Sequence, residues 1–220
     1  MDFLGLKTLG IINEALDNIK ETTGDIIDMD NIPIDDELTY KLFCDGGTVA
    51  VFQFESAGMQ KYLRELQPSK FEDIIAMVAL YRPGPMDNIP DFIARKQGRQ
   101  EIKYDFKCME KYLKDTYGIC VYQEQVMLLS RELADFTRGE SDTLRKAMGK
   151  KQLAKMEELY GKFMKQGVAK LTVTENLPED EVRKRLVKIW EEWKKFASYA
   201  FNKSHAACYS WVSYQTAYLK

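Results

Sequence analysis

The sequence predicts a mainly helical fold with one or two short β elements. Apolar residues recur at helical spacing along most of the chain, as Leu9, Ile12 and Leu16 do near its start. Only two short stretches, 48–54 and 116–122, are rich in β-branched and aromatic residues and are therefore candidate strands. With 220 residues and 45% hydrophobic content, the chain can bury a substantial core.

Helices of the first half are expected between glycine and proline signals. The first should end before Gly24, and the short helix near residue 40 should end at Gly46. Pro90 suits the first turn of a helix that Gly98 can terminate. The expected segments are LGLKTLGIINEALDNIK, DDELTYKLFC, SAGMQKYLREL, FEDIIAMVALY and DFIARKQ.

The second half is expected to be almost entirely helical. In the helix that follows Pro178, Val182, Leu186, Ile189 and Trp193 share one face, which predicts a buried stripe. A last helix should run from about Ser204 to the end. The remaining expected segments are QEQVMLLSRELADF, ESDTLRKAM and KQLAKMEELYGKFMKQ.

Charge is balanced overall but polarised along the chain. The net charge is −2, yet residues 1–40 hold ten acids and two lysines, whereas residues 138–170 hold nine basic and four acidic residues. Such runs are either solvated helix faces or a binding surface. The four cysteines form no CxxC pair, which favours reduced thiols over a zinc site. The absence of a signal-like start or a long apolar run predicts a cytoplasmic chain without a membrane span.

Two basic stretches could bind an anion. In LRKAMGKK, Arg145 and Lys146 lie late in a helix and Lys150 and Lys151 follow Gly149. Cations at a helix C-terminus, closed by a glycine cap, are ordinary stabilising features. The alternative is a cluster that holds a polyphosphate or a nucleic-acid backbone. In YRPGP, two prolines fix the turn that carries Arg82, which either positions this side chain or simply ends a helix.

The stretch FASYAFNKSHAACYSW holds the only histidine. Asn202 or Ser204 can cap the last helix, which places Lys203 and His205 on its first turn. Cations are unfavourable at this positive end unless an anion is bound there. The alternatives are a core histidine or solvated charges. The aromatic residues that follow, such as Tyr214, could stack on bases or pack a core.

Familiar catalytic sets are missing from the sequence: there is no P-loop, no nucleophile elbow and no HExxH. Read together, the motifs MDFLGLKTL, VFQFESAGM, FEDIIAMVALYRPGPM, TYGICVYQEQVM, LRKAMGKK and FASYAFNKSHAACYSWVSYQTAYLK closely resemble the alpha subunits of bacterial DNA polymerase III, the C-family replicative polymerases. The resemblance implies a helical fingers domain over residues 6–220, preceded by a palm-edge remnant at 1–5. Two lobes would meet near residues 98–115.

The resemblance also implies roles for the basic residues. Residues of LRKAMGKK would hold the triphosphate of an incoming deoxynucleotide, and residues of FNKSH would contribute from the helix N-terminus. Arg82 would be a further contact, whereas Tyr122 and Gln123 are motif residues without an assigned role. The implied nucleotide-binding set is Arg82, Arg145, Lys146, Lys150, Lys151, Asn202, Lys203, Ser204 and His205.

Catalysis is expected to need more than this chain. Asp2 matches the last of three palm acids that hold the metal ions, and it is the implied catalytic and metal-binding residue. The other two lie upstream in the family, so Mg²⁺ is expected in the complete polymerase and the isolated chain is expected to be inactive. The implied partners are a deoxynucleoside triphosphate, primer–template DNA and other replisome subunits, with no membrane. The alternative is a non-catalytic helical module that binds nucleic acid or protein.

Overall fold

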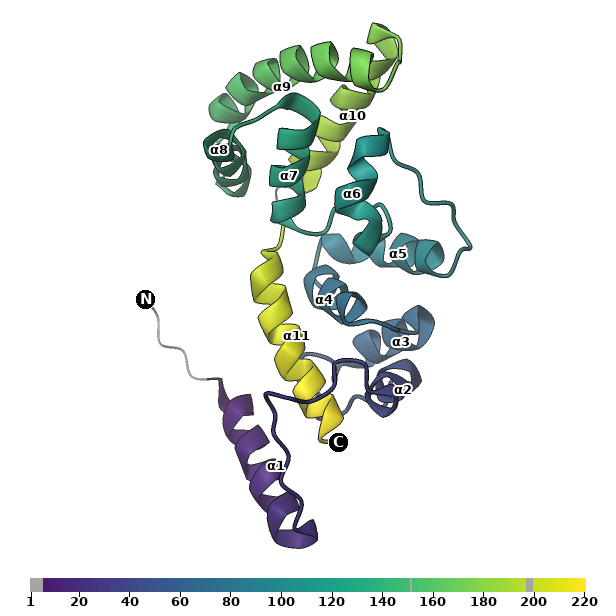
Figure 1. The fold of residues 1–220 in the computed structure, drawn as a ribbon, viewed down its shortest axis with the longest axis vertical. Helices are drawn as coiled ribbons and strands as arrows, with labels where there is room; N and C mark the ends of the chain where they lie inside the picture. Colours follow the sequence, from purple (N-terminus) through teal and green to yellow (C-terminus); the bar gives the residue numbers. More distant parts are fainter. Residues whose placement is uncertain (1–5, 151, 197–199) are drawn as a thin grey trace. The chain divides into compact units, whose positions relative to one another are not determined.

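The computed structural model describes residues 6–150, 152–196 and 200–220, and within these ranges the chain is helical and contains no strand. It divides into two compact units, which are described separately (Figure 1). The first comprises Met1–Val78 and Ser204–Lys220, and the second comprises Ala79–Lys203. The predicted mainly helical fold is confirmed.

The first unit holds α1 (Lys7–Thr23), α2 (Glu37–Asp45), α3 (Ala57–Leu66), most of α4 (Phe71–Leu80) and α11 (Lys203–Tyr218) after its first residue. Asp36 caps α2 by accepting from the Thr39 amide at 2.7 Å, and left-handed Gly46 ends it as predicted. Phe43 and Phe54 pack edge to face in the core. The predicted helix α1 also forms, but Leu9 of its apolar stripe is 50% exposed.

Tyr214 of α11 is a core residue of the first unit. Its ring is fully buried beside Phe71, and its hydroxyl donates to the Pro33 carbonyl at 2.7 Å and accepts from the Asp36 amide at 3.0 Å. A buried tyrosine whose hydroxyl is satisfied in this way stabilises its helix against the unit. Its ring packs a core and does not form a platform for bases.

The second unit is a helical cluster. Its elements are η1 (Pro85–Asn88), α5 (Ile89–Lys96), η2 (Lys107–Met109), α6 (Glu110–Leu113), η3 (Lys114–Thr116), α7 (Gln123–Ala134), α8 (Arg138–Gly149), α9 (Leu153–Thr174) and α10 (Glu179–Phe196). Helix α9 packs on α7 and α10, and α8 packs on α7 (Figure 1). Phe163 and Trp190 lie at the centre with ring centroids 5.1 Å apart. The stripe of α10 from Val182 to Trp193 is buried as predicted.

The strand predicted at 48–54 is wrong. The segment is a series of turns in which Ala50 and Gln53 adopt left-handed φ values of 63° and 66°, outside the β region. The Thr48 hydroxyl closes the loop by donating to the Phe54 carbonyl at 2.7 Å. Val51 and Phe54 are buried in a compact loop whereas Val49 is exposed, so only the composition of the segment resembles that of a strand.

The second predicted strand, 116–122, is also absent. Tyr117 and Gly118 turn the chain with left-handed φ values, and only Tyr122 pairs, in an isolated parallel bridge with Phe201. The stretch 98–115, where two lobes were expected to meet, lies inside the second unit. None of the four cysteines, all of which lie in the described ranges, forms a disulfide.

Candidate functional site

The start of α7 is fixed by one buried amide side chain. Gln125 is 6% exposed, and its Oε1 accepts from the backbone amides of Val121 and Tyr122 at 2.8 and 2.9 Å. Its Nε2 donates to the Tyr112 carbonyl at 3.1 Å and the Thr116 hydroxyl at 2.8 Å. All four hydrogen-bonding positions of the amide are used, which stabilises this path of the chain into α7.

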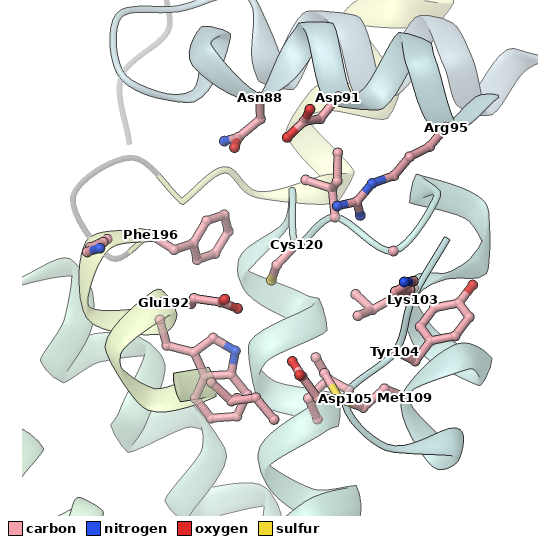
Figure 2. Close-up of a pocket in the computed structure, with 17 residues that line it drawn as sticks. Asn88, Asp91, Arg95, Lys103, Tyr104, Asp105, Met109, Cys120, Glu192 and Phe196 are labelled. Atoms are coloured by element: carbon pink, nitrogen blue, oxygen red, sulfur yellow. The ribbon is translucent and has the colours of Figure 1, made fainter. Parts of the chain in front are cut away.

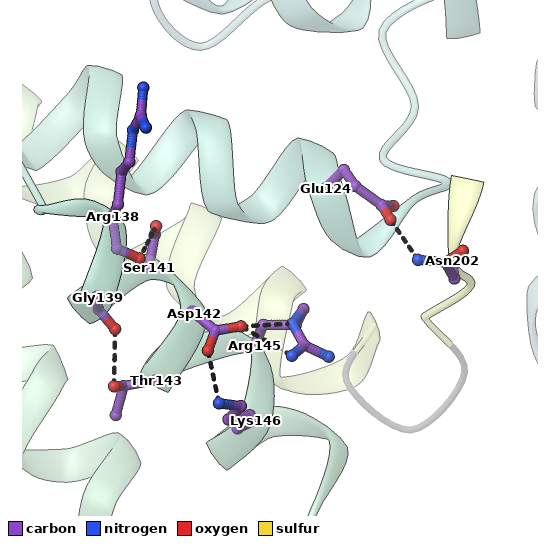
Figure 3. A network of polar contacts seen from close by, with 9 residues as sticks. All are labelled: Glu124, Arg138, Gly139, Ser141, Asp142, Thr143, Arg145, Lys146 and Asn202. Carbon is purple, nitrogen blue, oxygen red and sulfur yellow. Dashed lines mark hydrogen bonds and ion pairs between the residues drawn. The ribbon is translucent and has the colours of Figure 1, made fainter. Parts of the chain in front are cut away.

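The Glu124 side chain, in the first turn of α7, places its carboxylate at the N-terminus of α11. One carboxylate oxygen accepts from the Asn202 side-chain amide at 2.6 Å (Figure 3). The other accepts from the Lys203 backbone amide at 3.0 Å. A carboxylate at the positive end of a helix is stabilising. The protein itself therefore supplies an anion at the helix end where the sequence pattern called for one.

Two cations lie beside the same turn of chain, which we call the α7 corner (residues 122–125). The guanidinium carbon of Arg82 lies 4.1 Å from the ring centroid of Phe201, and its Nε and Nη2 donate to the Ala79 carbonyl at 3.0 and 2.9 Å. The Phe201 carbonyl accepts from the Gln123 amide at 2.9 Å. Lys203 Nζ lies 5.5 Å from the Tyr122 ring centroid, within range of a cation–π contact.

Helix α8 adds an ion cluster centred on Asp142. Arg145 donates to one carboxylate oxygen from Nε and Nη2 at 3.0 and 2.7 Å, and Lys146 Nζ lies 2.7 Å from the other (Figure 3). Hydrogen bonds from Lys146 and Arg145 lower the pKa of the Asp142 carboxyl. Arg145 and Gln123 line one cavity of about 50 Å³, which places Arg145 beside the α7 corner.

The other lysines of α8 line a different hollow. Lys146, Lys150 and Lys155 surround an open depression of about 490 Å³. The predicted glycine cap is wrong, because Gly149 is the last helical residue and Lys150 takes the cap position with a φ of −96°. The basic motif therefore divides between two places: Arg145 lies by the α7 corner, and Lys146 and Lys150 line the depression.

Four predicted site residues lie elsewhere or outside the described ranges. Ser204 and His205 belong to the first unit and are exposed on the first turn of α11. The His205 ring packs on Tyr209, with centroids 4.2 Å apart, so it is not a core histidine. Ser204 cannot cap the helix from within it, and the side-chain amide of Asn202 donates to Glu124. Asp2 and Lys151 lie outside the described residues.

Comparison with known proteins identifies this arrangement. Residues 8–170 match the family described as the bacterial DNA polymerase III alpha subunit finger domain. The chain belongs to this family. Relatives include DNA polymerase III subunit alpha of Neisseria meningitidis serogroup B, which is 50% identical over 219 residues, and those of Aquifex aeolicus and Thermus aquaticus, at 47% over 222 and 45% over 225 residues. Each alignment covers the whole chain but only 18% of the relative.

The described part of the finger domain does not supply a metal centre. Within it, no group of three or more histidine, cysteine, aspartate or glutamate residues could hold a metal ion. No described helix is long and apolar enough to span a membrane.

The sequence alone did not reveal Glu124 and Gln125. Gln125 accepts from the Tyr122 backbone amide, as the third helical residue of a capping box does. The usual pattern has serine or threonine at the cap, and this finger domain has Tyr122 there, so the pattern is masked. Glu124 contacts residues 78 and 79 positions away, and no local pattern reports such a pairing.

Replacing Glu124 with alanine is expected to lower the free energy of unfolding by about 1 kcal/mol, because the Lys203 amide loses its acceptor and the helix end loses a favourable charge. Urea denaturation followed by circular dichroism measures this change. Glu191→Ala is the matched control, since Glu191 forms a surface pair with Lys194 and its loss should cost less than about 0.5 kcal/mol. Equal effects of the two variants would contradict a capping role for Glu124.

Proposed function

We propose that this finger domain binds the incoming deoxynucleoside triphosphate and the template strand during DNA-directed DNA synthesis by a complete alpha subunit. The proposal is supported by the family of this chain and by relatives named DNA polymerase III subunit alpha. One of these relatives is 50% identical over 219 residues, in an alignment that covers the whole chain. The structural observation that carries the proposal is the gathering of Arg82, Arg145 and Lys203 at the α7 corner.

A triphosphate needs several donors because its oxygens and the departing pyrophosphate carry concentrated negative charge. Arg145 can present two guanidinium nitrogens to one phosphate, and Lys203 adds a point charge at the same corner. Arg82 stacks on Phe201 and thereby holds the backbone that carries Lys203. In this proposal Arg145 and Lys203 are the principal phosphate contacts, and Arg82 supports their placement.

The Glu124 contact determines which group of Lys203 is expected to bind the phosphate. Its carboxylate accepts from the Lys203 amide, so that amide does not serve as a phosphate donor while the contact persists. The phosphate is therefore expected to meet the Lys203 side chain. Arg145 is paired with Asp142, and a phosphate of higher charge competes with that carboxylate for the guanidinium. Lys146 keeps Asp142 paired when Arg145 turns away.

The remaining residues complete the proposed set. Lys146 and Lys150 line an open depression that suits a polyphosphate or a DNA backbone. Ser204 and His205 are exposed on the first turn of α11, and we propose them as further phosphate contacts in a complete polymerase. Asn202 shapes the corner through Glu124. We propose phosphate contact for Lys151 and a palm role for residues 1–5, with Asp2 as a metal-binding catalytic acid beside acids from elsewhere in the polymerase. In that setting the partners are Mg²⁺, primer–template DNA and other replisome subunits.

Lysine labelling tests the nucleotide assignment. The test uses a full-length alpha subunit that carries this sequence, with primer–template present. A deoxynucleoside triphosphate is expected to slow acetylation of Lys203 and Lys146 by about tenfold, because a lysine paired with phosphate stays in its unreactive ammonium form. Mass spectrometry reads each site. Lys184, exposed on α10, is the internal control and should label at the same rate with and without nucleotide.

The same experiment separates the alternative of a non-catalytic binding module. A module that binds only DNA would show protection by primer–template and no further protection by the matched nucleotide. Protection by the template-matched nucleotide, and much less by a mismatched one, supports the proposal. Identical labelling of Lys203 and Lys146 with and without nucleotide would count decisively against it.

A further inference from the structure

Asp142 on α8 binds two cations through different oxygens of its carboxylate. Arg145 donates from Nε and Nη2 to the single oxygen Oδ1, at 3.0 and 2.7 Å, and Lys146 Nζ lies 2.7 Å from Oδ2 (Figure 3). The strongest arginine–carboxylate pairs make two parallel hydrogen bonds to two oxygens. Because the second oxygen here is bonded to Lys146, Asp142 holds Arg145 in a weaker form of the pair.

Solvent reaches the pair of Asp142 and Arg145. About a third of each side chain is exposed, 35% for Asp142 and 32% for Arg145. Water and salt screen such pairs, which favour the paired state by no more than about fivefold. Arg145 is therefore able to exchange between Asp142 and a second anion.

A phosphate group is a better partner for Arg145 than the Asp142 carboxylate is. It carries more charge, and its oxygens match the planar guanidinium bidentately. Exchange does not leave Asp142 without a partner, because Lys146 stays bonded to it. Until exchange occurs, however, the Nε and Nη2 donors of Arg145 are occupied. A phosphate that binds through these donors must displace the carboxylate.

A cavity of about 320 Å³ between α5 and α10 does not offer the same exchange (Figure 2). The described residues that line it include equal numbers of basic and acidic side chains, namely Arg95, Lys103, Lys195, Asp91, Asp105 and Glu192. A polyphosphate needs an excess of cations, and this lining does not supply one. The cluster on α8 has two cations for one acid, so release of Arg145 supplies a full positive charge and leaves a balanced pair behind.

We infer that Asp142 is a positioning residue that sets the nucleotide affinity of the finger domain, because the incoming triphosphate must displace its carboxylate from Arg145. The inference rests on the proposed function, which makes Arg145 a triphosphate contact. When the binding form of a protein is only partly populated, the apparent Kd rises by the inverse of the populated fraction. A pair favoured about fivefold therefore weakens nucleotide binding about fivefold and leaves the bound complex unchanged.

Single-turnover incorporation by a full-length alpha subunit that carries this sequence, with saturating primer–template, tests the role of Asp142. Asp142→Asn keeps the shape of the side chain and removes its charge. It is expected to lower the Kd of the template-matched nucleotide about fivefold and to keep the maximal rate within about twofold, because only the free protein loses a contact. Asp142→Glu keeps the charge and should keep the Kd within about twofold of the parent value.

Two controls separate the loss of this pair from a general effect of charge. Glu179→Gln neutralises a carboxylate of α10 whose Oε1 accepts from Arg183 at 2.8 Å, and it should leave the nucleotide Kd within about 1.5-fold. In the Arg145→Ala background, Asp142→Asn should also change the Kd by less than about 1.5-fold, because the pair no longer exists. A fivefold gain that persists without Arg145 would assign the effect to charge alone and would overturn the inference.

The outcomes distinguish the role of Asp142 from the proposed function. If Arg145→Ala leaves nucleotide kinetics unchanged, the proposed function fails. If Arg145→Ala weakens nucleotide binding but Asp142→Asn leaves the Kd unchanged or raises it, the proposed function stands and the role of Asp142 is rejected. Because the pair is partly exposed, the melting temperatures of the Asp142 variants should stay within about 3 °C of the parent.

Discussion

Replacing Gln125 with leucine is expected to lower the free energy of unfolding by about 3 kcal/mol, because two buried amides, a carbonyl and a hydroxyl lose a partner in one step. Leucine has a similar volume, so the loss is chiefly polar. The Val121 and Tyr122 amides would be left without the acceptor that now bonds both. Urea denaturation followed by circular dichroism measures the change.

Gln152→Leu is the matched control for this variant. Gln152 precedes α9, is exposed and makes no side-chain cap hydrogen bond, so the same exchange there should change stability by less than about 0.5 kcal/mol. A comparable loss in both variants would show that leucine itself is harmful. A loss below about 1 kcal/mol at Gln125 would mean that the α7 corner does not depend on this amide.

The helices could be predicted because their signals are local. Apolar spacing marked the buried stripe of α10, and glycines in the left-handed region marked the ends of α1 and α2. Burial of a stripe, however, needs a neighbouring element. Leu9 lies on the predicted apolar face of α1 and is still half exposed, because periodicity shows which face is apolar and not what covers it.

The two strand predictions were wrong for a specific reason. Residues 48–54 have the composition of a strand, yet Ala50 and Gln53 adopt left-handed backbone conformations. Neither alanine nor glutamine is a residue type from which such a conformation is predicted. The Thr48–Phe54 hydrogen bond and burial of Val51 outweigh the local preference. Composition describes a half-buried apolar segment, whereas tertiary contacts decide whether that segment extends or turns.

At the candidate site, the sequence predicted an anion near the start of α11 but did not identify the group that supplies it. Cations on the first turn of α11 predicted a nearby anion, and the structure places the Glu124 carboxylate there. That contact joins residues 79 positions apart in sequence, beyond the reach of any local pattern. The division of LRKAMGKK between Arg145 at the corner and Lys146 at the depression likewise required the tertiary structure.

The kinetic variants carry the largest expected effect on activity. In a full-length alpha subunit that carries this sequence, Arg145→Ala and Lys203→Ala are each expected to lower kcat/KM for the incoming nucleotide about 100-fold, as removal of a transition-state donor does. Single-nucleotide incorporation with saturating primer–template measures the effect. Lys184→Ala, on the exposed face of α10, should remain within about twofold of the unmodified enzyme.

Both substitutions should leave the fold intact, because each spares the local contacts. Lys146 still pairs with Asp142 when Arg145 is removed, and the Lys203 backbone amide still donates to Glu124 when its side chain is removed. A melting temperature within a few degrees of the parent therefore makes a kinetic loss attributable to the missing charge. Because the lost contact is to the nucleotide, primer–template affinity should change far less than nucleotide kinetics. Unchanged kinetics in both variants would exclude Arg145 and Lys203 as triphosphate contacts, and a loss confined to DNA affinity would reassign them to the template backbone.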